Sequence, residues 1–323
     1  MITFSKALAI IQQEIEAINY PEYPDGLYKP VAYMMSMKGK KIRPALTLLA
    51  CNLFVEDISE AIKPALAWET FHNFTLMHDD LMDRASLRRG QQTVHKRWND
   101  NTAILSGDAM LILAYKLMEK SPANIMPSLL GLFSRTAAEI CEGQQFDMEF
   151  ENRIDITVSE YIEMIRLKTA VMIGACLKSG AIVGGASERN SEMLYRFGIN
   201  LGIAFQICDD LLDVYGNPYI FGKNIGGDIL CDKKTFLLVN ALNLSENEDR
   251  NKLLSWFRRK EQQEEKIGYF KQLFDKLKIR QLANATIVTY YKQAMADLDQ
   301  VSVSSENKEV LKSLSADLMK RES

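Results

Sequence analysis

Two short runs of aspartate share one spacing and carry the strongest chemical signal in the sequence. Asp79-Asp80-Leu81-Met82-Asp83 and Asp209-Asp210-Leu211-Leu212-Asp213 both read Asp-Asp-apolar-apolar-Asp inside an apolar run. On a helix the first and last aspartates of such a run lie about 40° apart, so the carboxylates share one flank. Carboxylates are seldom buried unless they are paired or bind a metal. Because Mg²⁺ usually takes one or two carboxylates plus substrate phosphates, the two runs predict a diphosphate held between them through Mg²⁺.

Basic residues stand beside the aspartate runs. Four cations lie within the six residues from 38 to 43, next to Gly39, and Arg88 and Arg89 follow the first run. A solvated helix start, or simple ion pairs with the aspartates, would explain them. They would equally suit phosphate, because arginine presents a planar fork and lysine a point charge. Lys168 enters an otherwise apolar segment and needs a partner, for which a phosphate would serve.

The three histidines all lie between positions 72 and 95, around the first aspartate run. His72 precedes Asp79 by seven residues, so a helix places both near one face, two turns apart. A lone histidine is more often a satisfied core residue, but these neighbours favour a binding role for His72. His78 points elsewhere on the helix and is expected to be structural.

Apolar periodicity at helical spacing runs through most of the chain, so the predicted fold is all-α. A loop is expected from Pro21 to Pro30, and a second loop, 221–228, is expected to fold over Asp213. The charged stretch 246–266 is expected to be a solvated helical face without a catalytic role. Helices are predicted over residues 4–18, 58–83, 102–119, 123–150 and 190–215.

Composition narrows the class of protein. The 323 residues carry a formal net charge of -3, which gives no electrostatic footprint for nucleic acid. The five cysteines are widely spaced, which indicates thiols in a reducing cytoplasm. The most apolar run, 169–187, is broken by a lysine and glycines, so no membrane span is expected. No linker divides the chain, and we expect a single domain over residues 1–323.

Taken together, these segments resemble the trans-isoprenyl diphosphate synthases (polyprenyl synthetases) of the short-chain type. The resemblance rests on DDxxD with RRG, FQxxDDxxD, GKxxRP, a KT pair and a GK loop, which here are Asp79–Asp83 with Arg88-Arg89-Gly90, Phe205–Asp213, Gly39–Pro44, Lys168-Thr169 and Gly222-Lys223. Two positions depart from the family's pattern. Met37-Lys38 precede Gly39 where the family usually has glycines, and Asp232 precedes Lys233 where it usually has glycine.

The resemblance implies a single large bundle of roughly ten to fifteen helices around a deep central cavity, usually as a homodimer. It implies that isopentenyl diphosphate is condensed head-to-tail with dimethylallyl, geranyl or farnesyl diphosphate. The products would be all-trans farnesyl or geranylgeranyl diphosphate. Ionisation of the allylic C–O bond would depend on three Mg²⁺ ions, with Mn²⁺ as a substitute ion.

The same resemblance implies a role for each motif residue. The metal ligands would be Asp79, Asp83 and Asp209, supported by Asp80, Asp210 and Asp213. The allylic diphosphate would contact Arg88, Lys168, Lys223 and Lys233, and the isopentenyl diphosphate would contact Lys40, Arg43, His72 and Arg89. Oxygens of Thr169, Gln206 and Lys168 would stabilise the allylic cation, and the released diphosphate would take the final proton.

By the same resemblance, the length of the prenyl product would be set by Thr75 and Phe74, which lie four and five residues before the first aspartate. Five residues of helix span roughly 7.5 Å, a depth suited to a short tail. Phe71 would form a second layer. An aromatic residue at position 74 predicts a product of fifteen to twenty carbons.

Three alternatives remain at this point. A class I terpene cyclase shares the bundle and DDxxD, but its second motif is mixed, whereas this chain has Asp209–Asp213. A His-Asp metal phosphohydrolase would use His72 and His78, but would leave the second aspartate run without a role. A non-catalytic subunit of a heteromeric prenyl synthase would tend to lose the aspartate motifs, and both are intact here.

Overall fold

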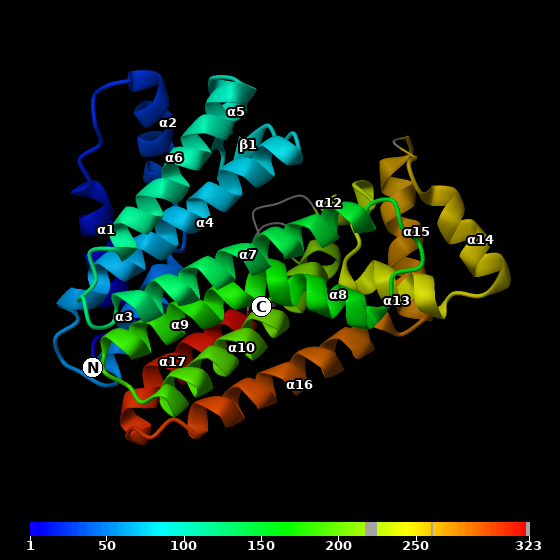
Figure 1. Cartoon of the computed structure of the whole chain (residues 1–323). Helices are drawn as coiled ribbons and strands as arrows, with labels where there is room; N and C mark the ends of the chain where they lie inside the picture. Colours follow the sequence, from blue (N-terminus) through cyan, green and yellow to red (C-terminus); the bar gives the residue numbers. More distant parts are fainter. Residues whose placement is uncertain (217–224, 260, 321–323) are drawn as a thin grey trace. The chain divides into compact units, whose positions relative to one another are not determined.

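Nearly every regular element of the chain is an α-helix, which confirms the all-α prediction. The computed structural model describes residues 1–216, 225–259 and 261–320 (Figure 1). The elements are α1 (Phe4–Glu16), α2 (Asp25–Ser36), α3 (Ile42–Asn52), η1 (Ser59–Ala61), α4 (Ile62–Met82), β1 (Leu87–Arg88), β2 (Gln91–Gln92), α5 (Val94–Arg97), α6 (Asp100–Met118), α7 (Met126–Phe150), α8 (Val158–Ile165), the π-helical turn η2 (Arg166–Ala170), α9 (Val171–Val183), α10 (Glu188–Tyr215), α12 (Gly227–Leu230), α13 (Phe236–Leu244), α14 (Asn247–Trp256), α15 (Gln263–Lys276), α16 (Ile279–Asp299) and α17 (Ser305–Met319). No described helix is long and apolar enough to cross a membrane.

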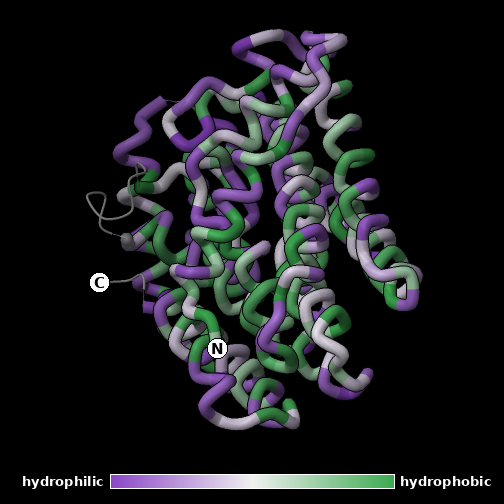
Figure 2. The backbone as a smooth tube through the Cα atoms, turned by 90° about the vertical axis from the view of Figure 1, so that its left-hand side faces the viewer, coloured by the Kyte–Doolittle hydropathy of each residue, from purple (hydrophilic) through white to green (hydrophobic). Residues whose placement is uncertain are grey.

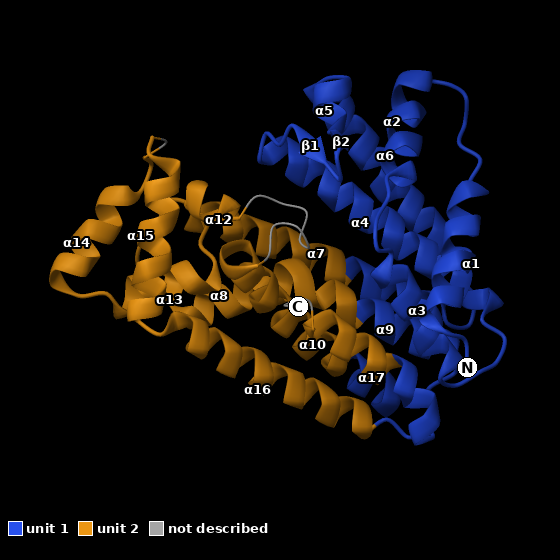
Figure 3. Cartoon of the chain, turned by 180° about the vertical axis from the view of Figure 1, so that it is seen from behind, with its two compact units in different colours: residues 1–134, 175–195, 301–310 blue, residues 135–174, 196–300, 311–323 orange. Residues whose placement is uncertain are grey.

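The chain forms two compact units, coloured separately in Figure 3. Unit 1 comprises residues 1–134, 175–195 and 301–310, and unit 2 comprises residues 135–174, 196–300 and 311–323. The first aspartate run therefore belongs to unit 1 and the second to unit 2. The expectation of a single domain over the whole chain stays a prediction.

Several helices begin where polar residues can cap free backbone N–H groups. The Asn99 side chain accepts from Thr102 N at 2.8 Å at the start of α6, and Thr235 accepts from Leu238 N at 3.3 Å at the start of α13. Thr157 and Glu160 form a capping box at α8. Each such cap contributes about 1 kcal/mol, so these sequence positions determine where the helices start.

The core of unit 1 is aromatic and forms around α4. Trp68 and Phe71 are fully buried, and both rings pack against Phe133 at centroid distances of 5.0 and 5.1 Å. The Trp68 indole donates to Ser179 Oγ at 2.9 Å. α6 packs closely on α4 because Gly107 faces the His78 ring and leaves no room for a Cβ. His78 also contacts the Ile104 carbonyl at 3.1 Å, in agreement with its expected structural role.

The core of unit 2 packs α10, α13, α15 and α16 together. Its largest fully buried side chains include Tyr161, Phe236, Phe270 and Phe274. Along much of the backbone hydrophobic and hydrophilic residues alternate at short intervals (Figure 2), as expected of helices with one buried face. α13 is almost wholly buried, with Phe236 to Leu242 all in the interior.

Two details of the predicted elements were wrong. Pro30 lies inside α2 and not in a loop, because α2 buries Pro30, Val31 and Met34. The charged stretch 246–266 is not entirely solvated, because Lys266 is 0% exposed.

Candidate functional site

The first aspartate run lies at the C-terminal end of α4. Asp80 is 2% exposed, Asp79 is half-buried and Asp83 is exposed. Asp80 Oδ2 accepts from Arg88 Nε at 2.7 Å, and Asp80 Oδ1 is buried with no hydrogen-bond partner among the described residues. Burial raises the pKa of the Asp80 carboxyl, and the Arg88 guanidinium opposes this rise. Asp79 and Asp83 are therefore the more exposed carboxylates of this run.

A two-residue hairpin, β1 with β2, carries the Arg88-Arg89-Gly90 motif. Arg89 and Gly90 have left-handed backbone conformations, with φ of 52° and 77°. The Arg89 guanidinium lies directly over Gly39, where an added Cβ would meet Arg89 Cζ at 2.7 Å. A side chain at position 39 would displace the Arg89 guanidinium, so this close approach joins the GKxxRP segment to the arginine motif.

Arg43 and His72 form the centre of a cationic cluster. Arg43 Nη1 lies 3.2 Å from His72 Nε2. Arginine has no acceptor, so Nε2 must accept, and His72 carries its proton on Nδ1. Burial lowers the pKa of His72 well below its ordinary value, and the nearby charges of Arg43, Arg89, Arg88 and Lys41 lower it further. Three of the four residues predicted for isopentenyl diphosphate are brought together here; Lys40 lies in the adjoining loop.

The sequence analysis missed a buried carboxylate beneath this cluster. Glu69 is 1% exposed, its Oε1 lies 3.0 Å from Lys41 Nζ, and it accepts from Asn73 Nδ2 at 3.0 Å. The Lys41 ammonium is 6% exposed, and its contact with Glu69 is ionic, without the angle of a hydrogen bond. Glu69 lies three residues before His72, so the two side chains are neighbours on one face of the helix. That spacing is the sequence signal from which Glu69 could have been predicted.

The second aspartate run lies on α10 and places Asp210 in the interior. Asp210 Oδ2 accepts from the Tyr161 hydroxyl and from Phe236 N, the latter at 2.7 Å, and Asp210 Oδ1 accepts from Gln206 Nε2 at 3.2 Å. Burial raises the pKa of Asp210 to about 7, although the Tyr161 and Phe236 hydrogen bonds oppose this. Asp209 is only partly buried.

Lys168 and Thr169 lie in the π-helical turn, a distortion that is frequent at functional sites. Lys168 Nζ lies 2.5 Å from Asp147 Oδ2, so its partner in this structure is a carboxylate that the sequence analysis did not assign. The Thr169 hydroxyl donates to Gln206 Oε1 at 3.2 Å. Because Gln206 Nε2 donates to Asp210, the amide orientation is fixed and its oxygen faces Thr169.

These side chains line a cavity of about 40 Å³ inside unit 2. The lining residues are Asp147, Tyr161, Met164, Ile165, Lys168, Thr169, Gln206, Asp210, Lys233, Lys234 and Thr235. Asp213 lies one turn further along α10 and accepts from Asp228 N at 3.1 Å, so residues 226–228 do fold against it. Lys233 is half-exposed beside this turn, 3.9 Å from Asp228. Lys223, the other predicted phosphate contact, lies outside the described residues.

Comparison with known proteins identifies the family. Residues 24–275 match the polyprenyl synthetase family. The chain belongs to this family of trans-prenyltransferases. It is 40% identical to a geranylgeranyl pyrophosphate synthase of Geoglobus acetivorans over 82% of each chain, and 37% identical to a geranylfarnesyl diphosphate synthase of Natronomonas pharaonis over 68% of this chain and 69% of that one. A solved geranylgeranyl pyrophosphate synthase superposes with a TM-score of 0.94 at 42% identity, covering 100% of both chains.

Within this polyprenyl synthetase, the predicted chain-length residues stack along α4. The Phe71 ring packs on Phe74 at 5.5 Å, and Phe74 packs on the His78 ring at 4.7 Å. The Thr75 hydroxyl donates to the His72 carbonyl at 2.8 Å, so it is turned toward its own helix. Phe71 is fully buried and Phe74 is only partly buried, so of these two rings Phe74 is the one with exposed surface.

The carboxylates of the synthetase suit Mg²⁺ but do not form a complete cage. No group of three or more His, Cys, Asp or Glu side chains within residues 1–216, 225–259 and 261–320 is arranged to hold a metal ion. Asp79, Asp83 and Asp209 are at least partly exposed, whereas Asp80, Asp210 and Asp213 are engaged by protein groups. Taken unit by unit, the exposed carboxylates are Asp79 and Asp83 in unit 1 and Asp209 in unit 2. One or two carboxylates suit an ion that completes its shell with phosphate and water.

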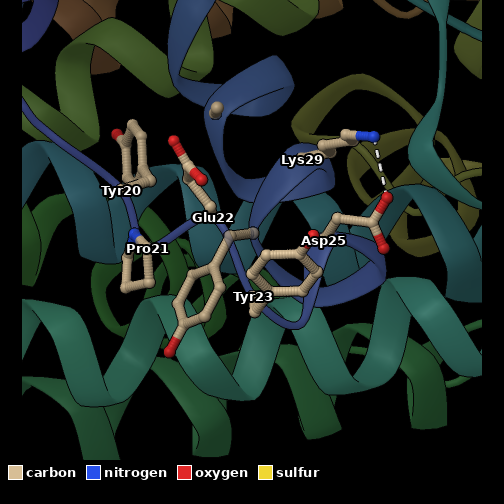
Figure 4. A pocket seen from close by; sticks show the side chains of 8 residues that line it. Tyr20, Pro21, Glu22, Tyr23, Asp25 and Lys29 are labelled. Carbon is tan, nitrogen blue, oxygen red and sulfur yellow. Dashed lines mark hydrogen bonds and ion pairs between the residues drawn. The ribbon is translucent and has the colours of Figure 1, made fainter.

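A larger hollow, of about 420 Å³, lies at the loop between α1 and α2 (Figure 4). Three tyrosines, two carboxylates and one lysine line it, and that lysine is already paired, since Lys29 Nζ lies 2.7 Å from Asp25 Oδ2. With two acidic side chains and no unpaired cation in its lining, this hollow does not suit a diphosphate. This hollow therefore gives no alternative to the aspartate motifs as a site for diphosphate.

Proposed function

We propose that this chain condenses isopentenyl diphosphate with an allylic diphosphate to give a short-chain all-trans prenyl diphosphate. The observation that carries the proposal is the division of the cations into two sets. Unit 1 gathers Arg43 and Arg89 around a neutral His72, and unit 2 places Lys168 beside Thr169 and Gln206. A reaction between two diphosphates needs two such anion sites. The relatives named as geranylgeranyl and geranylfarnesyl diphosphate synthases support this reaction.

The allylic diphosphate would be bound through the aspartate motifs, with Arg88, Lys168, Lys223 and Lys233 on its phosphate oxygens. By resemblance, Asp79, Asp83 and Asp209 would hold three Mg²⁺ ions. These ions would supply positive charge for the departing diphosphate. Mn²⁺ would serve as a substitute ion. Arg88 and Lys168 neutralise the same developing charge, and each would exchange its present carboxylate partner for a phosphate.

The allylic cation left by ionisation would be stabilised by neutral oxygens. Thr169 Oγ1 and Gln206 Oε1 are held 3.2 Å apart, and the Gln206 amide is locked by Asp210, so both oxygens are oriented before substrate binds. The isopentenyl double bond attacks the cation, and the released diphosphate takes the proton lost from the product. No side-chain general base is needed in this scheme.

The isopentenyl diphosphate would be bound by Lys40, Arg43, His72 and Arg89. The neutral His72 accepts from Arg43 and presents its Nδ1–H as a further donor. We also propose that the chain is one functional domain, forms a homodimer and acts in the cytoplasm. The five cysteines, all free, support a reducing compartment.

The decisive experiment is to supply radiolabelled isopentenyl diphosphate with dimethylallyl, geranyl or farnesyl diphosphate and Mg²⁺, and to chromatograph the products. We expect labelled linear prenyl diphosphates. A cyclic hydrocarbon formed without incorporation of label would indicate a terpene cyclase, and inactivity that a second protein relieves would indicate a subunit of a heteromeric enzyme. Asp209→Ala should lower turnover by several orders of magnitude with an unchanged circular dichroism spectrum; near-normal turnover would contradict the proposal.

The two diphosphate sites can be separated kinetically. Arg43→Ala and Lys40→Ala should mainly raise the KM for isopentenyl diphosphate, because both residues are assigned to the site without metal. A rise in the KM for the allylic substrate instead would show that the assignment of the two sites is wrong.

A further inference from the structure

Asp232 occupies an unusual backbone position immediately before Lys233. Its φ is 55°, in the left-handed region that glycine adopts freely and that aspartate and asparagine tolerate better than most residues. The loop is tight here, since Asp232 N donates to the Ile229 carbonyl at 3.2 Å and Lys233 N to the Asp228 carbonyl at 2.9 Å. This conformation explains why a glycine would fit, but it does not explain why this chain has an aspartate.

The Asp232 carboxylate ties this loop to a later part of unit 2. Its Oδ1 lies 2.7 Å from Lys266 Nζ, and its Oδ2 accepts from Arg258 N at 2.7 Å. The Lys266 side chain is 0% exposed, and Asp232 is the carboxylate that lies against it. A buried ammonium is stable only with a counter-charge, so the two residues depend on each other.

A second contact holds the same two segments together. α12 packs on α15, and at Gly226 an added Cβ would meet Ile267 Cδ1 at 2.8 Å. Ile267 is the neighbour of Lys266, so an apolar contact and an ion pair fasten both ends of the 226–232 segment to the start of α15. The stretch 246–266 thereby acquires a role in the structure that its charge pattern did not indicate.

The loop fixed in this way carries one wall of the cavity in unit 2. Lys233, Lys234 and Thr235 line that cavity, as do Lys168 and Gln206. Lys234 Nζ donates to the carbonyls of Glu151 and Asp232, at 3.0 and 3.1 Å, and Phe236 N donates to Asp210. A displacement of Asp232 would therefore move both the Lys233 side chain and the backbone donor that holds Asp210.

We propose that Asp232 and Lys266 are a pair of positioning residues that hold the 231–235 loop, and with it Lys233, in place for the allylic diphosphate. Neither residue touches the reacting atoms; both act through the loop. The proposal rests on the proposed function, because Lys233 is assigned there to the allylic diphosphate. At position 232, where the family usually has a glycine, the aspartate carboxylate attaches the loop to α15.

The test compares Asp232→Gly, which keeps the left-handed backbone but removes the attachment, with Lys266→Met. The matched control is Lys276→Met, which removes a lysine from the same helix whose partner, Asp249, it meets at the surface. Asp232→Gly and Lys266→Met should each raise the KM for the allylic diphosphate about tenfold and leave the KM for isopentenyl diphosphate within about twofold. Lys276→Met should change neither.

Limited trypsin digestion gives a readout that does not depend on activity. Both variants, but not Lys276→Met, should be cleaved faster after Lys233 and Lys234, because the loop is released. Equal rises in both KM values, or unchanged KM values with unchanged cleavage, would overturn the proposal. If the parent chain formed no prenyl diphosphate but the cleavage pattern held, the proposed function would fail while the attachment of the loop would stand.

Two further variants cover the case in which Asp232→Gly does not fold. Asp232→Asn keeps an acceptor of the same size, and the double variant Asp232→Asn with Lys266→Met removes both buried charges together. Asp232→Asn should raise the KM for the allylic substrate less than Asp232→Gly does. The double variant should regain thermal stability relative to Asp232→Asn alone; a further loss would contradict the mutual dependence of the pair.

Discussion

Arg88 Nε lies 2.7 Å from Asp80 Oδ2, so the second aspartate of the first motif is joined to the arginine of the RRG motif before any substrate binds. The Asp80 side chain is 2% exposed and that of Arg88 is 26% exposed. The carboxylate is therefore fixed in the interior, and the guanidinium reaches from it toward solvent. Within this run the Asp80 carboxylate binds the Arg88 guanidinium, whereas Asp79 and Asp83 are more exposed to solvent.

This difference predicts a graded effect of substitution. Asp80→Asn keeps an oxygen for Arg88 but loses the charge, and we expect kcat/KM for the allylic substrate to fall about tenfold to a hundredfold, or about 1.4–2.8 kcal/mol. Asp79→Asn should cost considerably more, because it removes a predicted metal ligand. Steady-state kinetics at saturating Mg²⁺ would measure both. Equal losses in the two variants would mean that Asp80 also acts on the metal.

Glu69 gives a prediction about stability. It is the buried partner of Lys41, and removing one member of a buried pair leaves the other charge without compensation. Glu69→Gln should therefore lower the free energy of unfolding by about 3–5 kcal/mol, measured by urea denaturation.

The control for Glu69 is Glu14→Gln. Glu14 pairs with Lys63 at 3.2 Å, but the two side chains are 31% and 42% exposed. A pair of this kind contributes at most about 1 kcal/mol, so the two glutamate substitutions should differ several-fold. Similar losses would show that Lys41 does not depend on Glu69.

Sequence reasoning located the parts of the site whose signals are local. Asp79 to Asp83 and Asp209 to Asp213 lie on helices as their spacing predicted. The partners that come from other parts of the chain were not predicted. Lys168 was expected to meet a phosphate, and in the structure it meets Asp147 on α7, 21 residues earlier. A single acidic residue in a helix has no pattern to mark it, because its significance lies in tertiary contact.

The misassigned elements have the same origin. Proline is disfavoured in a helix interior, so Pro30 indicated a loop, but the burial of its neighbours in α2 outweighs that local cost. Lys266 was read as part of a solvated face because residues of both signs surround it. The position of one buried ammonium in such a stretch depends on where a distant Asp232 lies. Both errors are cases in which packing overrides local preference.

His72 predicts how stability depends on pH. Its pKa is lowered well below the ordinary 6.5, first by burial and then by Arg43, Arg89, Arg88 and Lys41. Below pH 6.5 the unfolded chain gains a proton at this residue and the folded chain does not, so the free energy of unfolding falls with decreasing pH. The slope is at most about 1.4 kcal/mol per pH unit, and it ends at the folded-state pKa. At neutral pH and above, His72 is neutral in both the folded and the unfolded chain, so this loss of stability does not occur.

Replacing His72 by glutamine should remove that slope. Urea denaturation between about pH 5 and 7 would compare His72→Gln with the parent chain, and the difference in stability between them should narrow as the pH falls. His78→Gln is the control, since His78 lies on the same helix but outside the cationic cluster. A constant difference over this range would mean that folding does not shift the pKa of His72.

Product length is the last property that the structure makes testable. Phe71, Phe74 and His78 stack along α4, with ring centroids 5.5 and 4.7 Å apart. Phe71 also packs on Trp68 and Phe133 in the core, so Phe71→Ala should cost about 3–5 kcal/mol of stability. Phe74 has fewer such contacts and is only partly buried. It is therefore the residue that can be truncated without unfolding unit 1.

Phe74→Ala removes the ring that we expect to end the space for a growing prenyl tail. With the same primer and metal ion, the variant should yield products longer than those of the parent chain, which we expect to contain fifteen to twenty carbons. Reversed-phase chromatography of the dephosphorylated products would measure the shift, and thermal unfolding would verify that the variant is folded. Thr75→Ser tests the second predicted length-setting residue separately, because it keeps the hydroxyl that bonds to the His72 carbonyl and removes only a methyl group. An unchanged product distribution for Phe74→Ala would transfer the length-setting role to Phe71, whose milder substitution Phe71→Leu should then lengthen the products.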